Sequence, residues 1–172
     1  MFGKTLQLEL EIGAAEPVWV SLRDGTRTFV DGDWARIIIG ESWRVGHDKR
    51  GRPYVRRCLP GGQIAYLHRL IANAGPGSFV DHINGNSLDN RRANLRLCGN
   101  AQNAWNRGPS KRSPTKYKGV FRSHGGKWNS KIMVNGKRID LGQFATPEEA
   151  ARAYNDAARK HYGEFAYINE VA

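Results

Sequence analysis

A carboxylate beside an imidazole, followed by several asparagines, is the part of this sequence best suited to chemistry. Asp81 and His82 are adjacent, and Asn94 and Asn103, nine residues apart, follow them. Hydrolysis of a phosphodiester needs a general base that takes a proton from water and a hard cation that stabilises the developing negative charge. His82 is suited to the role of base, and carboxylate and amide oxygens are ligands that Mg²⁺ prefers. We therefore expect a metal-dependent phosphodiesterase site at these residues.

Short elements around this group have to position it. Residues 79–83 predict a strand, residues 84–86 a turn, and residues 94–97 a second strand. Alternation along the second strand predicts that Leu95 and Leu97 are both buried. Two short strands joined by a polar loop are therefore expected to hold the site.

The pairing of Asp81 with His82 constrains the first of these strands. Successive side chains on a strand point to opposite faces, so the two residues can face one site only where the strand bends or ends. A helix that starts near Asn100 would carry Asn103 on its first turn, facing back toward the strands. We expect the active site at the end of the first strand.

At these positions the sequence resembles the HNH nuclease family, in its homing-endonuclease branch with the ββα-metal fold. The resemblance rests on the Asp-His pair, on the run Asp-Asn-Arg-Arg-Ala-Asn-Leu-Arg at residues 89–96 and on the step from Asn94 to Asn103. It implies that Asp81 and Asn103 bind the metal ion, that His82 is the general base, and that Asn94 braces the loop carrying His82. The implied metal is Mg²⁺ or another divalent cation such as Mn²⁺.

A further histidine precedes this group. The segment Tyr-Leu-His-Arg-Leu-Ile at residues 66–71 also resembles the leading segment of the same branch. It makes His68 a candidate catalytic residue and a neighbour of His82. A histidine among apolar residues is alternatively a core residue whose nitrogens are satisfied, so both interpretations stay open.

The charge of the chain indicates a nucleic-acid partner. The chain has 27 Lys and Arg against 16 Asp and Glu, a formal net charge of +11 and a pI of about 10.1. A membrane surface is the competing acidic partner, but no apolar run approaches the roughly 18 residues of a membrane span, and no signal peptide opens the chain. We expect a cytoplasmic protein in a bacterium or phage-infected cell, a monomer or weak dimer, that binds double-stranded DNA and neither a membrane nor a small-molecule substrate.

Cysteine usage adds little. Cys58 and Cys98 are far apart and outside any Cys-x-x-Cys pair. A disulfide is not expected in a reducing compartment, and a zinc site would need two histidines to join both cysteines.

The distribution of prolines and charged residues along the chain predicts several small domains. Residues 104–116 contain four cations, two prolines and no acid, which is typical of an extended basic linker. We therefore expect a β-rich module at residues 1–60, a nuclease core at 61–107, a linker at 108–116 and a DNA-binding domain at 117–172. The first module is expected to have four short strands and a capped helix at residues 31–39, and either to complete the nuclease core or to grip DNA.

The C-terminal part predicts three strands followed by one helix. The strands are expected at residues 117–122, 127–134 and 137–144, with a hairpin turn at Asn135 and Gly136. Thr146 is the expected N-cap of the helix, and Gly163 ends it.

This part resembles the plant ethylene-response-factor (Apetala-type) DNA-binding domain over residues 117–169. The resemblance rests on the segments Tyr-Lys-Gly-Val, Gly-Lys-Trp, Leu-Gly-Gln-Phe and Glu-Glu-Ala-Ala-Arg-Ala-Tyr. It implies a three-stranded sheet that enters the major groove, with Lys118 and Arg138 at positions of basic contacts. Several other positions depart from the plant pattern, so the plant recognition sequence is not expected. Further candidate DNA contacts are Arg122, Lys127, Lys131 and Lys137.

We therefore predict an α+β protein with a β-rich N-terminal module, a ββα-metal core and a C-terminal three-stranded antiparallel sheet packed on one helix. The predicted function is that of an HNH homing endonuclease of phage or mobile-element origin, targeted by its C-terminal sheet. The nuclease core is expected to cut DNA and the C-terminal domain to bind it, so that a fragment ending near Arg107 still cuts DNA. The alternatives are a non-catalytic DNA-binding regulator or architectural protein and, with less support, an RNA-binding factor.

Overall fold

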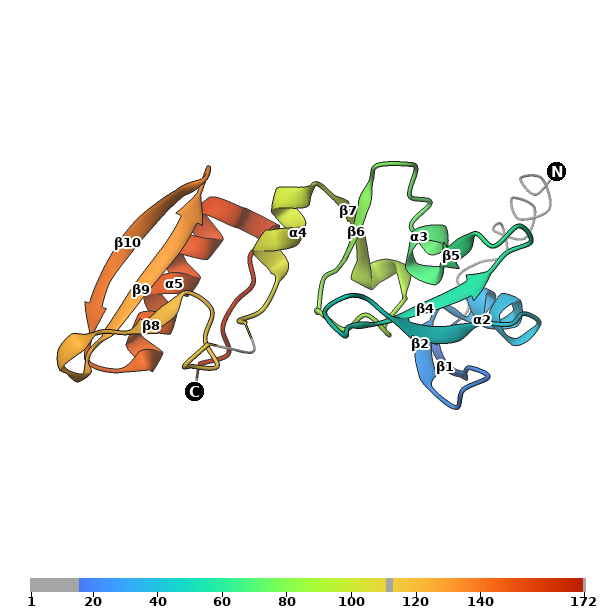
Figure 1. Cartoon of the computed structure of the whole chain (residues 1–172), viewed down its shortest axis with the longest axis horizontal. Coiled ribbons are helices and arrows are strands. Elements are labelled where there is room, and N and C mark those ends of the chain that lie inside the picture. Colours follow the sequence, from blue (N-terminus) through green and yellow to red (C-terminus); the bar gives the residue numbers. More distant parts are fainter. Residues whose placement is uncertain (1–15, 111–112, 172) are drawn as a thin grey trace. The chain divides into compact units, whose positions relative to one another are not determined.

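The chain forms two compact units, Met1–Cys98 and Gly99–Ala172, in a computed structural model (Figure 1). The structure describes residues 16–110 and 113–171. Residues 1–15 of the expected N-terminal module and residues 111–112 of the expected linker lie outside the described residues. Helices and antiparallel sheets occur in both units, which confirms the α+β class.

Between residues 16 and 98, the first unit contains three small antiparallel sheets and two short α-helices. The pairs β1–β2 and β6–β7 are two-stranded, and β3, β4 and β5 form one sheet in that order. A 3₁₀ turn, Arg92–Asn94, precedes β7. The elements are β1 (Val18–Ser21), β2 (Arg27–Val30), α2 (Gly32–Ile39), β3 (Arg44–His47), β4 (Pro53–Cys58), β5 (Ile64–Tyr66), α3 (Leu67–Ile71), β6 (Phe79–His82) and β7 (Leu95–Cys98).

One hydrophobic core joins these elements. Val30 of β2, Trp43 and Leu67 of α3 are each almost completely buried in it, and Leu95 of β7 packs against it. The N-terminal strands therefore form part of the same core as the segment that carries the candidate site.

The prediction that Leu97 is buried is wrong. Leu97 is 53% exposed, whereas Leu95, on the same face of β7, is partly buried. Leu95 pairs with His82 next to the core, and Leu97 pairs with Val80 one step farther along the ribbon. The alternation of residues along a strand predicts the face on which each side chain lies. How many side chains on that face are buried depends on how far the hydrophobic core extends beneath the strand.

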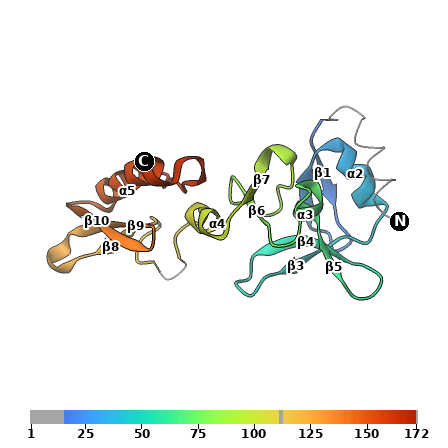
Figure 2. The same cartoon turned by 90° about the horizontal axis from the view of Figure 1, so that it is seen from above.

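The second unit consists of one three-stranded antiparallel sheet and the helices around it. The order of the strands is β10-β9-β8, and α5 packs along one face of this sheet (Figures 1 and 2). The elements are α4 (Asn100–Asn106), β8 (Val120–Arg122), β9 (Trp128–Val134), β10 (Lys137–Phe144) and α5 (Pro147–Tyr162), with 3₁₀ turns at His124–Gly126 and Gly163–Phe165.

Local signals position α5 and the hairpin before it. Thr146 accepts a hydrogen bond from the backbone N–H of Glu149, whose carboxylate accepts from the N–H of Thr146 in return. Gly163 ends the helix, and Asn135 with Gly136 turns the hairpin at positive φ, as expected.

The first strand of this sheet is shorter than expected. Residues 117–122 predict a strand, but β8 begins only at Val120. Gly119 has a φ of +79°, and a Cβ atom there would lie 2.1 Å from Cδ2 of Tyr154 and 2.7 Å from the carbonyl oxygen of Lys131. The ring of Tyr154 therefore packs where a side chain would otherwise be.

Gly119→Ala is expected to destabilise the second unit more than Gly136→Ala. Both glycines have φ near +80°, so either alanine costs about 1–2 kcal/mol of backbone strain, but only Gly136 has open space around its Cα. Overpacking against Tyr154 adds about 1–3 kcal/mol at Gly119. Hydrogen exchange of the α5 amides in the full chain measures both losses, and equal losses would contradict the packing described for Tyr154.

Candidate active site

Asp81 and His82 lie at the end of β6, and both side chains are buried. The strand ends at His82, whose carbonyl accepts a hydrogen bond from the N–H of Gly85, where φ is +72°. Asp81 faces its cross-strand partner Arg96 on β7, and His82 faces Asn90. A strand end thus lets two neighbouring side chains be buried together, as the sequence predicts.

A chain of hydrogen bonds fixes the His82 ring. The hydroxyl of Thr28 donates to the carbonyl oxygen of Leu88 at 2.8 Å, so it can only accept from the Asn90 amide, whose Nδ2 lies 2.9 Å away. This orientation turns Oδ1 of Asn90 toward Nε2 of His82, at 3.3 Å. Nε2 must then carry the proton in the neutral ring, and Nδ1 is the basic nitrogen.

Burial keeps His82 neutral. Loss of hydration lowers its pKa, and this effect outweighs the hydrogen bond that His82 donates to Asn90 and the charge of Asp81, which raise it. A neutral imidazole at neutral pH is the form that can accept a proton.

His68 lies beside His82, in α3. The two ring centroids are 5.3 Å apart, and the Tyr54 ring is also 5.3 Å from His68. Burial lowers the pKa of His68 to about 3, and repulsion by Arg69, and by His82 whenever that ring is protonated, acts in the same direction. Its Nδ1 is buried and has no hydrogen-bond partner among the described residues. His68 is thus a neutral neighbour of His82 and is not a core histidine with both nitrogens satisfied.

Asn94 braces the loop between β6 and β7. Its Oδ1 accepts from the N–H of Asn84 at 3.0 Å, and its Nδ2 donates to the carbonyl oxygen of Asp89 at 2.7 Å. Its carbonyl also accepts from the N–H of Ile83 at 2.9 Å. Asn94 therefore ties both halves of the loop to the end of β6.

The same loop is anchored to the N-terminal strands. The N–H of Phe29 donates to Leu88, and the N–H of Asn90 donates to Phe29, both through backbone carbonyls. The guanidinium of Arg92 pairs with Asp31 and Asp33 at the start of α2. Asp31 is the N-cap residue of α2, as expected, but its carboxylate accepts from Arg92 and does not cap the helix.

Asp81 is the carboxylate with which a metal site would be built. Its Oδ2 accepts from Nε and Nη2 of Arg96, at 3.0 and 2.8 Å, and both side chains are mostly buried. Within residues 16–110 and 113–171 no group of three or more His, Cys, Asp or Glu residues is placed to hold a metal ion. The expected ligands, one carboxylate and one amide, do not need such a group, and the guanidinium beside Asp81 shows that this position accommodates positive charge. The donor chemistry thus fits a hard divalent cation.

Asn103 lies on α4, in the second unit. The helix begins at Asn100, as expected, with Gly99 as the N-cap residue and Gln102 accepting from the Gly99 N–H. The first unit therefore brings together Asp81, His82, His68 and Asn94, and Asn103 belongs to the other unit.

Sequence reasoning missed three residues of this site. Asn90 and Arg96 stand within the run at residues 89–96 that carries the family resemblance, but the run alone does not give their partners. Thr28 is 62 residues from Asn90, and no local pattern connects them.

The candidate DNA contacts differ in the face of the sheet that they occupy. Arg138 pairs with exposed Met133, so it lies on the open face, as does Lys131, which pairs with Asp140. Lys137 pairs with Val134, which packs toward α5.

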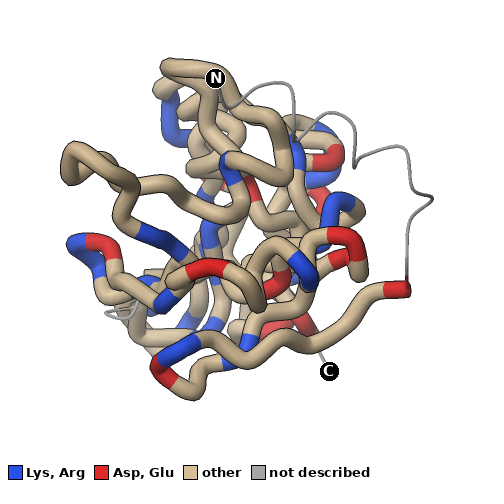
Figure 3. Tube along the Cα trace, turned by 90° about the vertical axis from the view of Figure 1, so that its right-hand side faces the viewer, with Lys and Arg blue, Asp and Glu red and all other residues tan. Residues whose placement is uncertain are grey.

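The other three candidate DNA contacts are Arg122, Lys127 and Lys118, of which Lys118 lies in an unexpected position. Arg122 pairs with Trp128, which packs toward α5, and Lys127 precedes β9 and is exposed. Lys118 is half-buried, and its ammonium donates to carbonyl oxygens of α4. Lys and Arg residues occur in both units. Figure 3 shows them spread along the trace rather than gathered on one segment.

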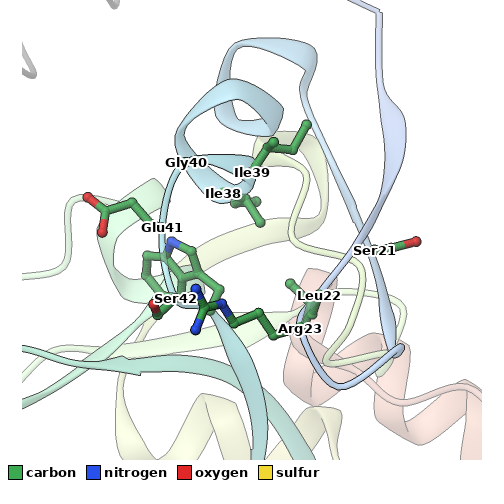
Figure 4. Close-up of a pocket in the computed structure, with 9 residues that line it drawn as sticks. Ser21, Leu22, Arg23, Ile38, Ile39, Gly40, Glu41 and Ser42 are labelled. Carbon is green, nitrogen blue, oxygen red and sulfur yellow. The ribbon is translucent and has the colours of Figure 1, made fainter.

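A shallow pocket of the first unit lies elsewhere. Ser21, Leu22 and Arg23 line it on one side, and residues 38–43 line it on the other (Figure 4). None of the predicted site residues contributes to it, so we assign it no role in the chemistry. Among the described helices, none is long and apolar enough to cross a bilayer.

Comparison with known proteins identifies relatives of both parts. Residues 65–105 match the family model described as HNH endonuclease. An uncharacterised HNH endonuclease of Acanthamoeba polyphaga mimivirus is 33% identical over 150 residues, which cover 86% of this chain and 76% of the viral protein.

Plant proteins match a shorter region. Dehydration-responsive element-binding protein 2E of Oryza sativa subsp. japonica is 42% identical over 74 residues, 38% of this chain and 23% of the plant protein. Dehydration-responsive element-binding protein 2D of Arabidopsis thaliana is 48% identical over 64 residues, 36% of this chain and 31% of that protein. The chain thus spans less than a third of either plant relative, and both resemblances stated from the sequence are confirmed.

The stability of the first unit is expected to fall as the pH drops below about 6.5. An unfolded histidine binds a proton there, whereas folded His68 does not until about pH 3, so the unfolded state binds more protons between these values. Burial of His82 acts in the same direction. Urea unfolding in EDTA at pH 7 and pH 5 measures the difference, and His68→Gln is expected to reduce it.

The exposed His47 provides the control for this measurement. His47→Gln is expected to alter the pH dependence less than His68→Gln does, because His47 is exposed and His68 is buried. A pH dependence that His68→Gln and His47→Gln alter equally would contradict the burial assigned to His68.

Proposed function

The chain belongs to the HNH endonuclease family, and from that premise we propose that it is a metal-dependent endonuclease of the homing type that cuts double-stranded DNA. The observation that carries the proposal is the fixed tautomer of His82, because a buried neutral imidazole with a basic Nδ1 is suited to proton abstraction and has no evident use in a protein that only binds. A phage or mobile-element origin is part of the same proposal.

In the proposed reaction, His82 takes a proton from the water that attacks the scissile phosphorus. Asn90 holds the ring through Nε2, and Thr28 holds Asn90, so the base has one orientation before the substrate arrives. His68 and Tyr54 limit the access of bulk water to the ring from their side.

Asp81 and Asn103 are the proposed metal ligands. A divalent cation such as Mg²⁺ or Mn²⁺, when bound, would stabilise negative charge on the phosphate and on the departing 3′ oxygen. Arg96 pairs with Oδ2 of Asp81, so a cation bound at this oxygen would have to displace the guanidinium. The expected products carry a 5′ phosphate and a 3′ hydroxyl.

The second unit is the proposed DNA reader. Plant relatives of this part are named as element-binding proteins, and the open face of β8–β10 presents Arg138 and Lys131. Phosphate contacts would fix the register of the sheet on the duplex, and base contacts would give the preference for a site.

His82→Ala is expected to lower metal-dependent cleavage of plasmid DNA roughly 10²-fold or more, because it removes the general base. Binding of a duplex in EDTA is expected to stay close to that of the original protein. Asp81→Ala and Asn103→Ala are expected to abolish cleavage through loss of the metal ion, and Asn90→Ala to reduce it by a smaller factor.

His124→Ala is the matched control, since this histidine is exposed and lies in the second unit. It should cleave at the original rate. Cleavage by His82→Ala at nearly the original rate would contradict the assignment of His82 as the general base. Tight DNA binding without any cleavage by the original protein would favour a DNA-binding regulator.

Arg138→Ala and Lys137→Ala are expected to separate the two faces of the sheet. These neighbours on β10 point to opposite faces, and only Arg138 lies on the open one. If Arg138 contacts a base, its loss costs about 1–3 kcal/mol on the preferred duplex and little on a scrambled duplex. Titrations across a salt series measure both, and a larger loss for Lys137→Ala would place the DNA on another face.

A further inference from the structure

Helix α4 is the last helix of the segment that matches the HNH family, and it packs within the second unit. The family match extends to residue 105 and therefore includes most of α4, yet α4 belongs to the compact unit Gly99–Ala172. An isolated helix of seven residues is not stable in water, so packing has to hold it. The contacts that hold α4 therefore decide how Asn103 is presented.

An aromatic stack fixes one side of α4. The ring of Trp105 lies parallel to that of Tyr162 of α5, with centroids 4.7 Å apart and an interplanar angle of 8°. Tyr162 is itself buried, and its hydroxyl donates to the carbonyl oxygen of Met133 on β9. Trp105 thus joins the hydrophobic cluster between α5 and the sheet.

A half-buried lysine, Lys118, fixes the C-terminal end of the same helix. Nζ of Lys118 donates to the carbonyl oxygen of Trp105 and to that of Ala104, the latter at 3.3 Å. The carbonyl of Trp105 also accepts from the N–H of Tyr167 at 3.2 Å. The last carbonyls of a helix have no partner within it and carry a partial negative charge, so an ammonium group there stabilises the helix.

The backbone of Lys118 is held firmly as well. Its N–H donates to Oδ1 of Asn169 at 2.7 Å, and Nδ2 of Asn169 donates back to its carbonyl at 3.1 Å. Asn169 is in turn bonded to the buried side chain of Asn155 on α5. Burial lowers the pKa of Lys118 to about 8, so the ammonium is still charged at neutral pH.

We propose that the C-terminal unit is a structural part of the nuclease: through Trp105 and Lys118 it holds α4 in the conformation that presents Asn103 to the metal ion. The inference rests on the proposed function, since it takes Asn103 as a ligand. Lys118 is then a positioning residue, whereas the sequence resemblance implies a DNA contact for it. On this proposal a fragment ending near Arg107 is expected not to cut DNA, whereas the sequence predicts that it does.

The test compares Lys118→Met with Lys160→Met in the full chain. Both changes remove one lysine charge and keep most of the stem, but Lys160 is exposed and lies in the last turn of α5. Three quantities are measured: hydrogen exchange of the α4 amides in EDTA, duplex affinity in EDTA across a salt series, and the Mg²⁺ concentration for half-maximal cleavage.

Lys118→Met is expected to speed exchange in α4, to leave duplex affinity and its salt dependence unchanged, and to raise the Mg²⁺ requirement roughly 10- to 100-fold, as loss of an outer partner of a metal ligand does. Lys160→Met is expected to change none of these. Lys118→Arg is expected to restore them in part, because a guanidinium can donate to the same two carbonyls. Trp105→Ala is expected to reproduce the effects of Lys118→Met.

Two results would overturn the proposal. A flatter salt dependence, by about one unit, with unchanged exchange in α4 would make Lys118 a phosphate contact. Faster exchange in α4 with an unchanged Mg²⁺ requirement would separate α4 from the metal site.

Failure of the proposed function is distinguishable from failure of this inference. If the original protein cleaves no duplex, calorimetric titration with Mn²⁺ replaces the third measurement. Weaker Mn²⁺ binding by Lys118→Met than by Lys160→Met would then support the positioning role, and equal binding would overturn it.

Discussion

The buried hydrogen-bond chain from Thr28 through Asn90 to His82 is the interaction on which the rest of the first unit depends. Thr28 and Asn90 are fully buried, and a buried polar group is costly unless each of its bonds is made. Satisfying these hydrogen bonds fixes the orientation of the Asn90 amide, and that orientation places the proton of neutral His82 on Nε2. The catalytic chemistry that we propose is therefore set by a folding constraint in β2, far from His82 in the sequence.

The same constraint explains why the N-terminal strands share a core with the nuclease segment. The loop between β6 and β7 is rich in Asn, Asp and Arg and has little apolar surface of its own to bury. It is held by the backbone of Phe29, by the acidic start of α2 and by Asn94. Without that support the loop would lose the order that keeps His82 dry and neutral.

We propose for the second unit two tasks that sequence patterns assign to separate domains. Its sheet leaves one face open, and its helix α5 uses small residues and two tyrosines to pack the other. The cluster that closes this packing also takes in Trp105 of α4. A helix of seven residues depends on such neighbours. If the second unit has both of the roles that we propose for it, recognition of a duplex and support of the catalytic centre would be linked through this one hydrophobic cluster.

The sequence by itself determined the local features: the Asp81 and His82 pair at a strand end, the turn at Asn135 and Gly136, and the caps of α5. Each depends on residues a few positions apart, whose types and spacing are visible in the chain. The tertiary structure alone decided the partner of Asn90, the exposure of Leu97 and the engagement of Lys118 with α4. These depend on contacts between residues distant in sequence and on where the core ends, and neither local propensity nor periodicity carries that information.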